Sequence, residues 1–117
     1  MIQRMEELLL IQKFERNMKS GYSIDWSDEA SDNLDSIIEY LQNKWTDREI
    51  RRFFKKLDKR IDLISKNPLL FPVVDLTMNA RRSVLTAQTT IYYQIKLDVV
   101  IILSLFDNRR DPHSFRI

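Results

Sequence analysis

Basic and aromatic side chains gather in the last third of the chain, where their types would suit binding to an anionic partner such as RNA. The set is Arg81, Arg82, Tyr92, Lys96, Arg109 and Arg110. A tyrosine ring can stack on an unpaired base, and arginine and lysine bind phosphate oxygens. The same residue types also fit an ordinary exposed sheet face with solvated charges. Both interpretations stay open on these residues alone.

Cleavage of RNA through the 2′-hydroxyl would require more than binding. It needs a general base, a general acid and a group that stabilises charge on the phosphorane. The candidates within the set are Tyr92, Lys96 and Arg82. No histidine or glutamate lies among the strands predicted below, so a good base near neutral pH is missing. The catalytic residues of such a reaction therefore stay unknown.

Composition argues against several other kinds of site. The chain has no cysteine, which rules out a disulfide scaffold and a thiolate metal site. Its one histidine, His113, disfavours a Ser-His-Asp triad and a multi-histidine metal site. We expect no metal and no cofactor. The formal net charge of +2 is too small to indicate nucleic acid by itself.

No targeting segment is visible in the sequence, and we expect a cytoplasmic protein without a membrane partner. The apolar run from Leu8 to Ile11 has charged neighbours. It is much shorter than the roughly 7–15 residues of a signal h-region or the about 20 of a membrane span. Hydrophobic residues make up 44% of the chain and charged residues 31%, which suits a domain with a core and a solvated surface.

A strand and two helices are expected before the basic and aromatic set. Residues Tyr22 to Trp26 alternate apolar and polar types, as a short strand does. Ser27 follows as the N-cap of a helix, and Thr46-Asp-Arg-Glu49 is a capping box that starts a second helix. Asn67-Pro68 ends this second helix, because proline cannot continue it. Since almost no loop separates the two helices, they should form an antiparallel hairpin.

Three further strands are expected to carry the set. They are Arg81 to Leu85, Thr89 to Lys96 and Val99 to Phe106, with Leu97-Asp98 as a hairpin turn and residues 67–79 irregular. Neighbours in a strand point to opposite faces, so Arg81 or Arg82, but not both, should share the exposed face with Tyr92 and Lys96. The order of elements predicts an α+β fold: an N-terminal strand, an antiparallel helix hairpin and a three-stranded antiparallel sheet.

Residues 1–20 are expected to form a helical appendage to a domain that spans residues 21–117. Apolar residues recur at helical spacing up to Met18, and Lys19-Ser20-Gly21 breaks the pattern. Two explanations stay open. The segment docks on the domain, or it is upstream sequence read through from an early start codon, with Met18 as the alternative start.

Large aromatic side chains are expected in the core between the helices and the sheet. They are Trp26, Trp45, Phe53, Phe54 and Tyr93. Tyr40 lies away from the centre of the apolar stripe of the first helix and should be half exposed.

Charge splits between the two predicted helices. Residues 27–45 carry a net charge of −4 and residues 46–66 a net charge of +4. The acids of the first are Asp28, Glu29, Asp32, Asp35 and Glu39, and the bases of the second are Arg48, Arg51, Arg52, Lys55, Lys56, Lys59, Arg60 and Lys66. One interpretation is that the helices neutralise each other and present a solvated face. The other is a basic ridge that meets an acidic partner, either a protein segment or RNA.

Three motifs, taken in their order and spacing, resemble the RelE/ParE toxin superfamily over about residues 22–112. The first is the strand and helix start Tyr22-Ser-Ile-Asp-Trp-Ser-Asp-Glu-Ala30. The second is the end of the helix pair, Leu63-Ile-Ser-Lys-Asn-Pro68. The third is Ile91-Tyr-Tyr-Gln-Ile95, followed by the apolar strand Val100 to Phe106 and the tail Asp107-Asn-Arg-Arg-Asp-Pro112.

The resemblance implies the toxin of a type II toxin–antitoxin pair, neutralised by a cognate antitoxin protein. RelE-like members cut mRNA on the ribosome, whereas ParE-like members bind and poison DNA gyrase without a catalytic constellation. The long helix pair and the missing acid–base set favour a ParE-like gyrase inhibitor. A RelE-like mRNA endonuclease is the alternative, and a degenerate member that only binds a partner is a third.

An exposed apolar patch that includes Phe71, Val73 and Phe115 would suit an antitoxin helix or strand. Arg52 and Lys56 of the basic ridge are also expected to bind the antitoxin. Docking of residues 1–18 on the apolar patch is an equally simple explanation for the patch.

The sequence departs from the family pattern at two places. Thr89 and Thr90 occupy a stretch that often holds a basic residue, which puts an anion contact there in doubt. The usual glycine after the helix pair is missing, and Leu69 to Val73 stands in its place.

Overall fold

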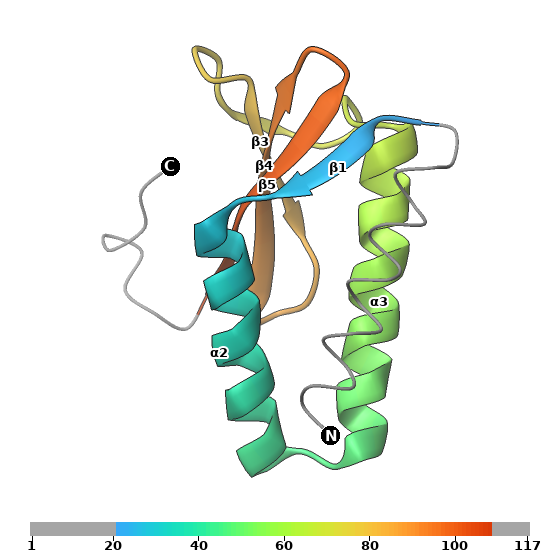
Figure 1. Ribbon diagram of the computed structural model, residues 1–117, viewed down its shortest axis with the longest axis vertical. Coiled ribbons are helices and arrows are strands. Elements are labelled where there is room, and N and C mark those ends of the chain that lie inside the picture. The colour runs from blue at the N-terminus through green and yellow to red at the C-terminus, as the bar shows by residue number, and fades with distance from the viewer. Residues whose placement is uncertain (1–20, 109–117) are drawn as a thin grey trace.

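The computed structural model describes residues 21–108, which form two helices and one mixed sheet (Figure 1). The elements are β1 (Ser23–Trp26), α2 (Asp28–Lys44), α3 (Asp47–Lys66), β2 (Val73–Asp75), β3 (Ala80–Val84), β4 (Thr89–Lys96) and β5 (Val99–Asp107). The predicted N-terminal helix and the candidate site residues Arg109, Arg110 and Phe115 lie outside the described residues.

The five strands are ordered β1-β5-β4-β3-β2 across the sheet. The pairs β2–β3, β3–β4 and β4–β5 are antiparallel. Strand β1 runs parallel to β5, with Ile24 opposite Val100 and Trp26 opposite Ile102. The two helices carry the chain away from β1 before the last strand returns beside it. The predicted α+β fold, with its N-terminal strand and its helix hairpin, is confirmed.

One strand was missing from the sequence prediction, which made residues 67–79 irregular. Val73–Asp75 forms β2, the edge strand beside β3. It has three residues, follows Pro72 and pairs with a register shift between Val73 and Asp75. A segment this short shows no alternation of apolar and polar residues, and proline is typical of sheet edges.

Both helices begin at the N-caps predicted from the sequence, and α3 also ends at its predicted residue. Ser27 accepts a hydrogen bond from the Ala30 amide at 3.0 Å and donates one to the Leu103 carbonyl at 2.8 Å. The cap of α2 is therefore also tied to β5. Thr46 and Glu49 form the expected capping box of α3, and Asn67 is its C-cap, directly before Pro68.

The chain's one glycine allows β1 to begin against the end of α3. Gly21 has φ +117°, and a Cβ there would lie 2.9 Å from the Ser65 side-chain oxygen. The Tyr22 amide donates to the Ser65 carbonyl and the Ser65 hydroxyl to the Tyr22 carbonyl, both at 2.9 Å. These bonds hold Tyr22 beside the loop that follows α3.

The core lies between one face of the sheet and the two helices, and Figure 1 shows both helices on the same face. Phe53 and Tyr93 are buried, and Trp26 and Phe54 pack against the core as expected. Tyr40, at 40% exposed, also agrees with its prediction. The prediction for Trp45 was wrong, since this side chain is 39% exposed. Helix α2 ends at Lys44, one residue before Trp45, and Trp45 is its C-cap with an extended backbone.

Candidate functional site

The sheet face away from the helices carries a row of paired side chains across three strands. Arg82 of β3 is the partner of Tyr92 of β4, which is the partner of Ser104 of β5. Directly opposite residues of an antiparallel pair point to the same face. The prediction that only one of the two neighbouring arginines would share a face with Tyr92 is therefore confirmed, and that arginine is Arg82.

Tyr92 is half-buried within this row. Its ring meets the Phe106 ring edge-on, with 6.3 Å between the ring centroids. Phe106 comes from β5, where it is opposite Thr90. Such an edge-to-face contact fixes the ring of Tyr92 without covering it. The row therefore combines an exposed arginine with a positioned aromatic ring.

Lys96 lies on the same face but at the far end of β4, beside the β4–β5 turn. It is exposed and opposite Val99. Four residues of strand separate it from Tyr92, which is about 13 Å along the sheet. Leu97 in the turn has φ 57° and is 91% exposed. The three candidate residues Arg82, Tyr92 and Lys96 thus line one face without meeting at one point.

Arg81 lies on the opposite face, where it holds the loop after α3. Its guanidinium donates to the Phe71 carbonyl at 2.8 Å and to the Leu69 carbonyl at 3.2 Å. Arg81 is opposite Tyr93, whose buried hydroxyl donates to the Pro68 carbonyl at 2.6 Å. Burial raises the pKa of Tyr93 to about 12, although the positive charge of Arg81 acts in the opposite direction.

Arg60 of α3 is also bound to the sheet rather than free on the basic helix face. It donates to the Ser83 hydroxyl at 2.8 Å and to the Val84 carbonyl at 2.7 Å. Its guanidinium lies 5.7 Å from the centroid of the Phe71 ring, within the range of a cation–π contact. Sequence reasoning did not find this role, because the partners of Arg60 lie on a strand 23 and 24 residues away.

Exposed apolar side chains occur on the loop after α3, on the edge strand β2 and directly after β2. We call this set the edge patch: Leu69, Leu70, Val73, Val74 and Leu76. Leu69 and Leu70 are 67% and 62% exposed, although the backbone around them is held by Arg81 and Tyr93. The patch is therefore presented on a fixed loop. Sequence periodicity could not predict that these apolar side chains are exposed, because the loop has no regular pattern of apolar and polar residues.

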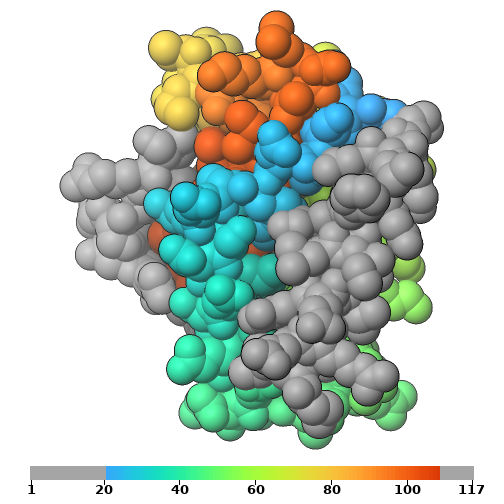
Figure 2. Space-filling view, viewed as in Figure 1, coloured from blue at the N-terminus to red at the C-terminus, as the bar shows by residue number. Residues whose placement is uncertain are grey.

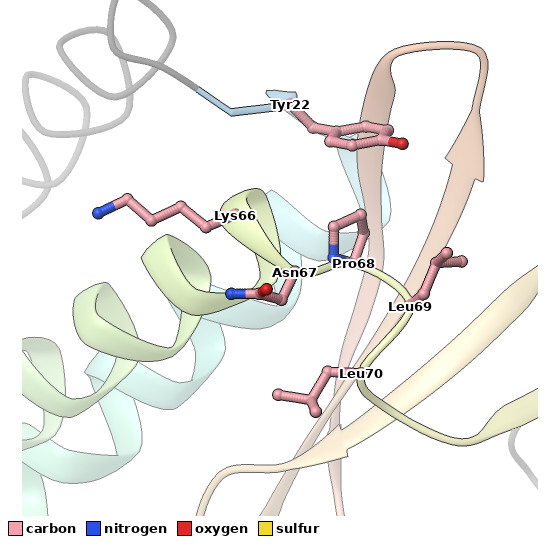
Figure 3. A pocket seen from close by; sticks show the side chains of 6 residues that line it. All are labelled: Tyr22, Lys66, Asn67, Pro68, Leu69 and Leu70. Carbon is pink, nitrogen blue, oxygen red and sulfur yellow. The ribbon is translucent and has the colours of Figure 1, made fainter.

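A shallow hollow of about 480 Å³ adjoins the edge patch. It is lined by Tyr22, Lys66, Asn67, Pro68, Leu69 and Leu70. Figure 3 shows Tyr22 on one side of it and the loop after α3 on the other. The lining is mostly apolar, so the hollow suits an apolar side chain of a partner rather than a polar substrate.

The residues predicted to bind an antitoxin fall into two separate places. Arg52 and Lys56 are exposed in the first half of α3, whereas Val73 is exposed on β2. Ten residues of helix separate Lys56 from the end of α3, which is about 15 Å. Phe71 is half-buried against the core and does not stand on the surface.

Within residues 21–108 the structure holds no cluster of three or more residues that could ligate a metal. In the same part of the chain, neither helix combines the length and the apolar character needed to cross a membrane. Neither finding adds a cofactor or a membrane contact to the surfaces described above.

Comparisons with known proteins agree with this fold. A family model described as "ParE toxin of type II toxin-antitoxin system, parDE" matches residues 24–112. A solved structure titled "Chromosomal ParDE TA system from P. aeruginosa" is similar, with a TM-score of 0.63 and 12% sequence identity. The alignment covers 76% of this chain and 98% of that one. A search of curated proteins finds no match.

Proposed function

Because this chain belongs to the ParE toxin family of type II toxin–antitoxin systems, we propose that it inhibits DNA gyrase and that a cognate antitoxin neutralises it. The observation that carries the choice of gyrase is the spread of the candidate residues over the sheet face. Lys96 lies about 13 Å along β4 from Tyr92. Such a surface suits binding, whereas cleavage of a phosphodiester needs a base, an acid and a charge-stabilising group around one bond.

Gyrase would be held by the sheet face away from the helices, with the exposed Arg82 and the half-buried Tyr92 as the central contacts. Arginine and tyrosine are the side chains that most often carry binding energy at protein interfaces. The edge-on contact with Phe106 keeps the Tyr92 ring in place before binding, so little side-chain entropy is lost. Lys96 would add a peripheral charge, and Arg109 and Arg110 follow β5 in sequence.

One observation favours mRNA cleavage as a second candidate. Arg82 and Tyr92 are direct cross-strand partners, and this pair could bind a phosphate and a base of one nucleotide. In that case Tyr92→Phe and Arg82→Ala would both abolish cleavage of a message in a translating lysate. For gyrase the hydroxyl of Tyr92 has no chemical step to perform.

The antitoxin is proposed to dock on the edge patch and the hollow beside it. The similar solved structure is titled as a toxin–antitoxin system, which supports a protein partner of this kind. The patch is apolar and exposed, and β2 is an edge strand to which a further strand can be added. Arg52 and Lys56 lie too far along α3 to belong to the same small surface.

The test is a supercoiling assay with purified gyrase, this protein and no ribosomes. Inhibition that is reversed by the antitoxin supports the proposal. Absence of inhibition, together with message cleavage in a translating lysate, overturns it in favour of the second candidate. If the protein shows neither activity in vitro and its expression is harmless in a bacterium that lacks the antitoxin, the conclusion is that it only binds a partner.

A further inference from the structure

The turn between β4 and β5 has a leucine where the backbone favours glycine or asparagine. Leu97 and Asp98 are the two residues that connect these strands. Two-residue hairpin turns need a positive φ at their first central position, which is usually glycine, asparagine or aspartate. Leu97 has φ 57°, a left-handed conformation in which a bulky side chain crowds the following carbonyl. The leucine therefore costs the folded chain stability that an asparagine would not.

The side chain of Leu97 makes up for none of this cost by packing. It is 91% exposed, more than any other large apolar side chain in the part of the chain that the structure describes. A single exposed leucine is ordinary on a protein surface, but one held in a disfavoured backbone conformation is not. The exposure and the backbone conformation of Leu97 together indicate a role outside the fold.

The turn is fixed by hydrogen bonds on both sides. From β1, the Ser23 amide donates to the Asp98 carbonyl at 3.2 Å. From the β2–β3 turn, the Asn79 carbonyl accepts from the Ile95 amide at 3.2 Å, and the Asn79 side chain donates to the Ile95 carbonyl at 3.4 Å. An apolar side chain on such a fixed base loses little conformational freedom when it binds a partner.

The turn lies at one end of the molecule. Figure 1 shows it at the opposite end from the connection between α2 and α3. In Figure 2 the orange atoms of β4 and β5 reach the top of the surface, beside the yellow atoms near the β2–β3 turn. A partner that binds the neighbouring sheet face can therefore also reach Leu97.

We propose that Leu97 is an apolar anchor of the toxin on DNA gyrase and enters an apolar pocket of that enzyme. Lys96 and Asp98 flank it and are both exposed, so the pocket should have an acid on one side and a base on the other. The inference rests on the proposed function, because it names a further contact of the same interface.

Leu97 is close enough to Tyr92 to belong to one interface with it. Five residues of extended chain separate the two, which is about 17 Å. A standard interface covers about 800 Å² of each partner, and such a patch is roughly 30 Å across. One bound protein can therefore contact Arg82, Tyr92 and Leu97 together.

A membrane surface fits this turn less well than a protein pocket. Apolar side chains that hold proteins on anionic lipids have several bases around them. Here the positive charge of Lys96 is matched by the negative charge of Asp98. A single leucine also buries too little apolar surface to hold a protein on lipid. A protein, in contrast, can place charges of both signs around one small pocket.

The first test compares Leu97→Asn with the wild type in thermal unfolding and in the gyrase supercoiling assay. Asparagine accepts a positive φ, so the midpoint of unfolding should rise by about 4 °C. The concentration needed for half-maximal inhibition should nevertheless rise by about tenfold, because the anchor is lost. A leucine without a partner would give a variant that inhibits as well as the wild type.

Leu97→Met is the matched control, since it keeps a flexible apolar side chain at the same position. It should inhibit gyrase nearly as well as the wild type. Equal inhibition by Leu97→Asn and the wild type overturns this inference and leaves the proposed function in place. A wild-type protein that does not inhibit gyrase overturns both. A lower midpoint of unfolding for Leu97→Asn also overturns the inference, because the leucine would then serve the fold.

The second test detects the contact directly. A photoreactive phenylalanine analogue in place of Leu97 should crosslink to gyrase in a mixture of the full chain and the enzyme. The same analogue in place of Gln42, exposed near the end of α2, should not. Absence of a crosslink from the turn overturns the inference. So does binding to phosphatidylglycerol vesicles by the wild type but not by Leu97→Asn, since the turn would then belong to a lipid surface.

Discussion

Arg82 and Tyr92 are direct partners on neighbouring antiparallel strands, on the sheet face away from the helices. Arg82 is held there by its own backbone, since its amide donates to the Pro72 carbonyl at 3.1 Å. Its side chain can therefore be changed without disturbing the sheet. This pair is the best place to distinguish the two candidate activities of the toxin.

We expect Arg82→Ala to raise the concentration needed for half-maximal inhibition of gyrase by about tenfold or more, since central arginines at interfaces often contribute over 1 kcal/mol. Tyr92→Phe keeps the ring and its contact with Phe106, so inhibition should be nearly unchanged. Arg51→Ala, an exposed arginine on α3, is the control. Loss of activity on Tyr92→Phe would point to a chemical role for the hydroxyl and against the gyrase proposal.

The buried hydroxyl of Tyr93 gives a prediction for stability against pH. Its pKa in the folded protein is about 12, above the usual value of 10.0. The unfolded chain thus loses this proton at a lower pH than the folded chain. The stabilisation is fully present below pH 10 and decreases as pH rises from 10 toward 12.

Tyr93→Phe removes this contribution and leaves the Pro68 carbonyl without its donor. Near pH 7 the free energy of unfolding should fall by about 1–3 kcal/mol, measured with urea. Between pH 10 and 12 the variant should lose less stability than the wild type does. The other tyrosines and the lysines titrate in both proteins, so their contributions to the pH dependence of stability cancel in the comparison. Equal pH dependence in the two proteins would contradict the prediction.

Arg60→Ala removes two hydrogen bonds to β3 and the contact with the Phe71 ring. We expect the free energy of unfolding to fall by about 1–3 kcal/mol, because the buried Ser83 hydroxyl also loses its partner. Lys59→Ala on the exposed side of the same helix should change it by less than about 0.5 kcal/mol. Similar effects of the two substitutions would show that Arg60 is an ordinary surface charge.

Leu69→Ser together with Leu70→Ser should weaken antitoxin binding without loss of stability. Both side chains are mostly exposed, so their removal costs the folded chain little. Isothermal titration with the antitoxin should give a dissociation constant at least about tenfold higher, equivalent to 1.4 kcal/mol. Leu97→Asn removes an even more exposed leucine from the β4–β5 turn and is the control. Unchanged affinity in the double variant would move the antitoxin to another surface.

Much of the fold could be predicted because its determinants are local. Ser27 and the Thr46–Glu49 capping box mark helix starts through hydrogen bonds three residues apart, and Pro68 marks a helix end. The alternation of side chains along a strand placed Arg81 and Arg82 of β3 on opposite faces for the same reason. Trp45 escaped prediction because the apolar pattern continues past the point where the next cap forces α2 to end.

The parts that could not be predicted depend on contacts between distant residues. From the sequence, Arg60 belonged to the basic helix and Arg81 to the candidate binding set, but both bind carbonyl groups that only the folded chain brings near. The short edge strand β2 exists because β3 offers it a partner. Arg52 and Lys56 lie on a different surface from Val73, which could not be predicted because spacing along the chain does not show distance in space.

The bond between Ser27 and the Leu103 carbonyl joins residues 76 positions apart, and β1 has β5 as its one neighbour in the sheet. During synthesis on the ribosome, Ile24 and Trp26 of β1 therefore have no strand to pair with until β5 has emerged. Long-range pairing of this kind delays folding. Strand β1 and the N-cap of α2 therefore become stable only once β5 is in place, so these two distant parts of the described chain should fold as one cooperative unit.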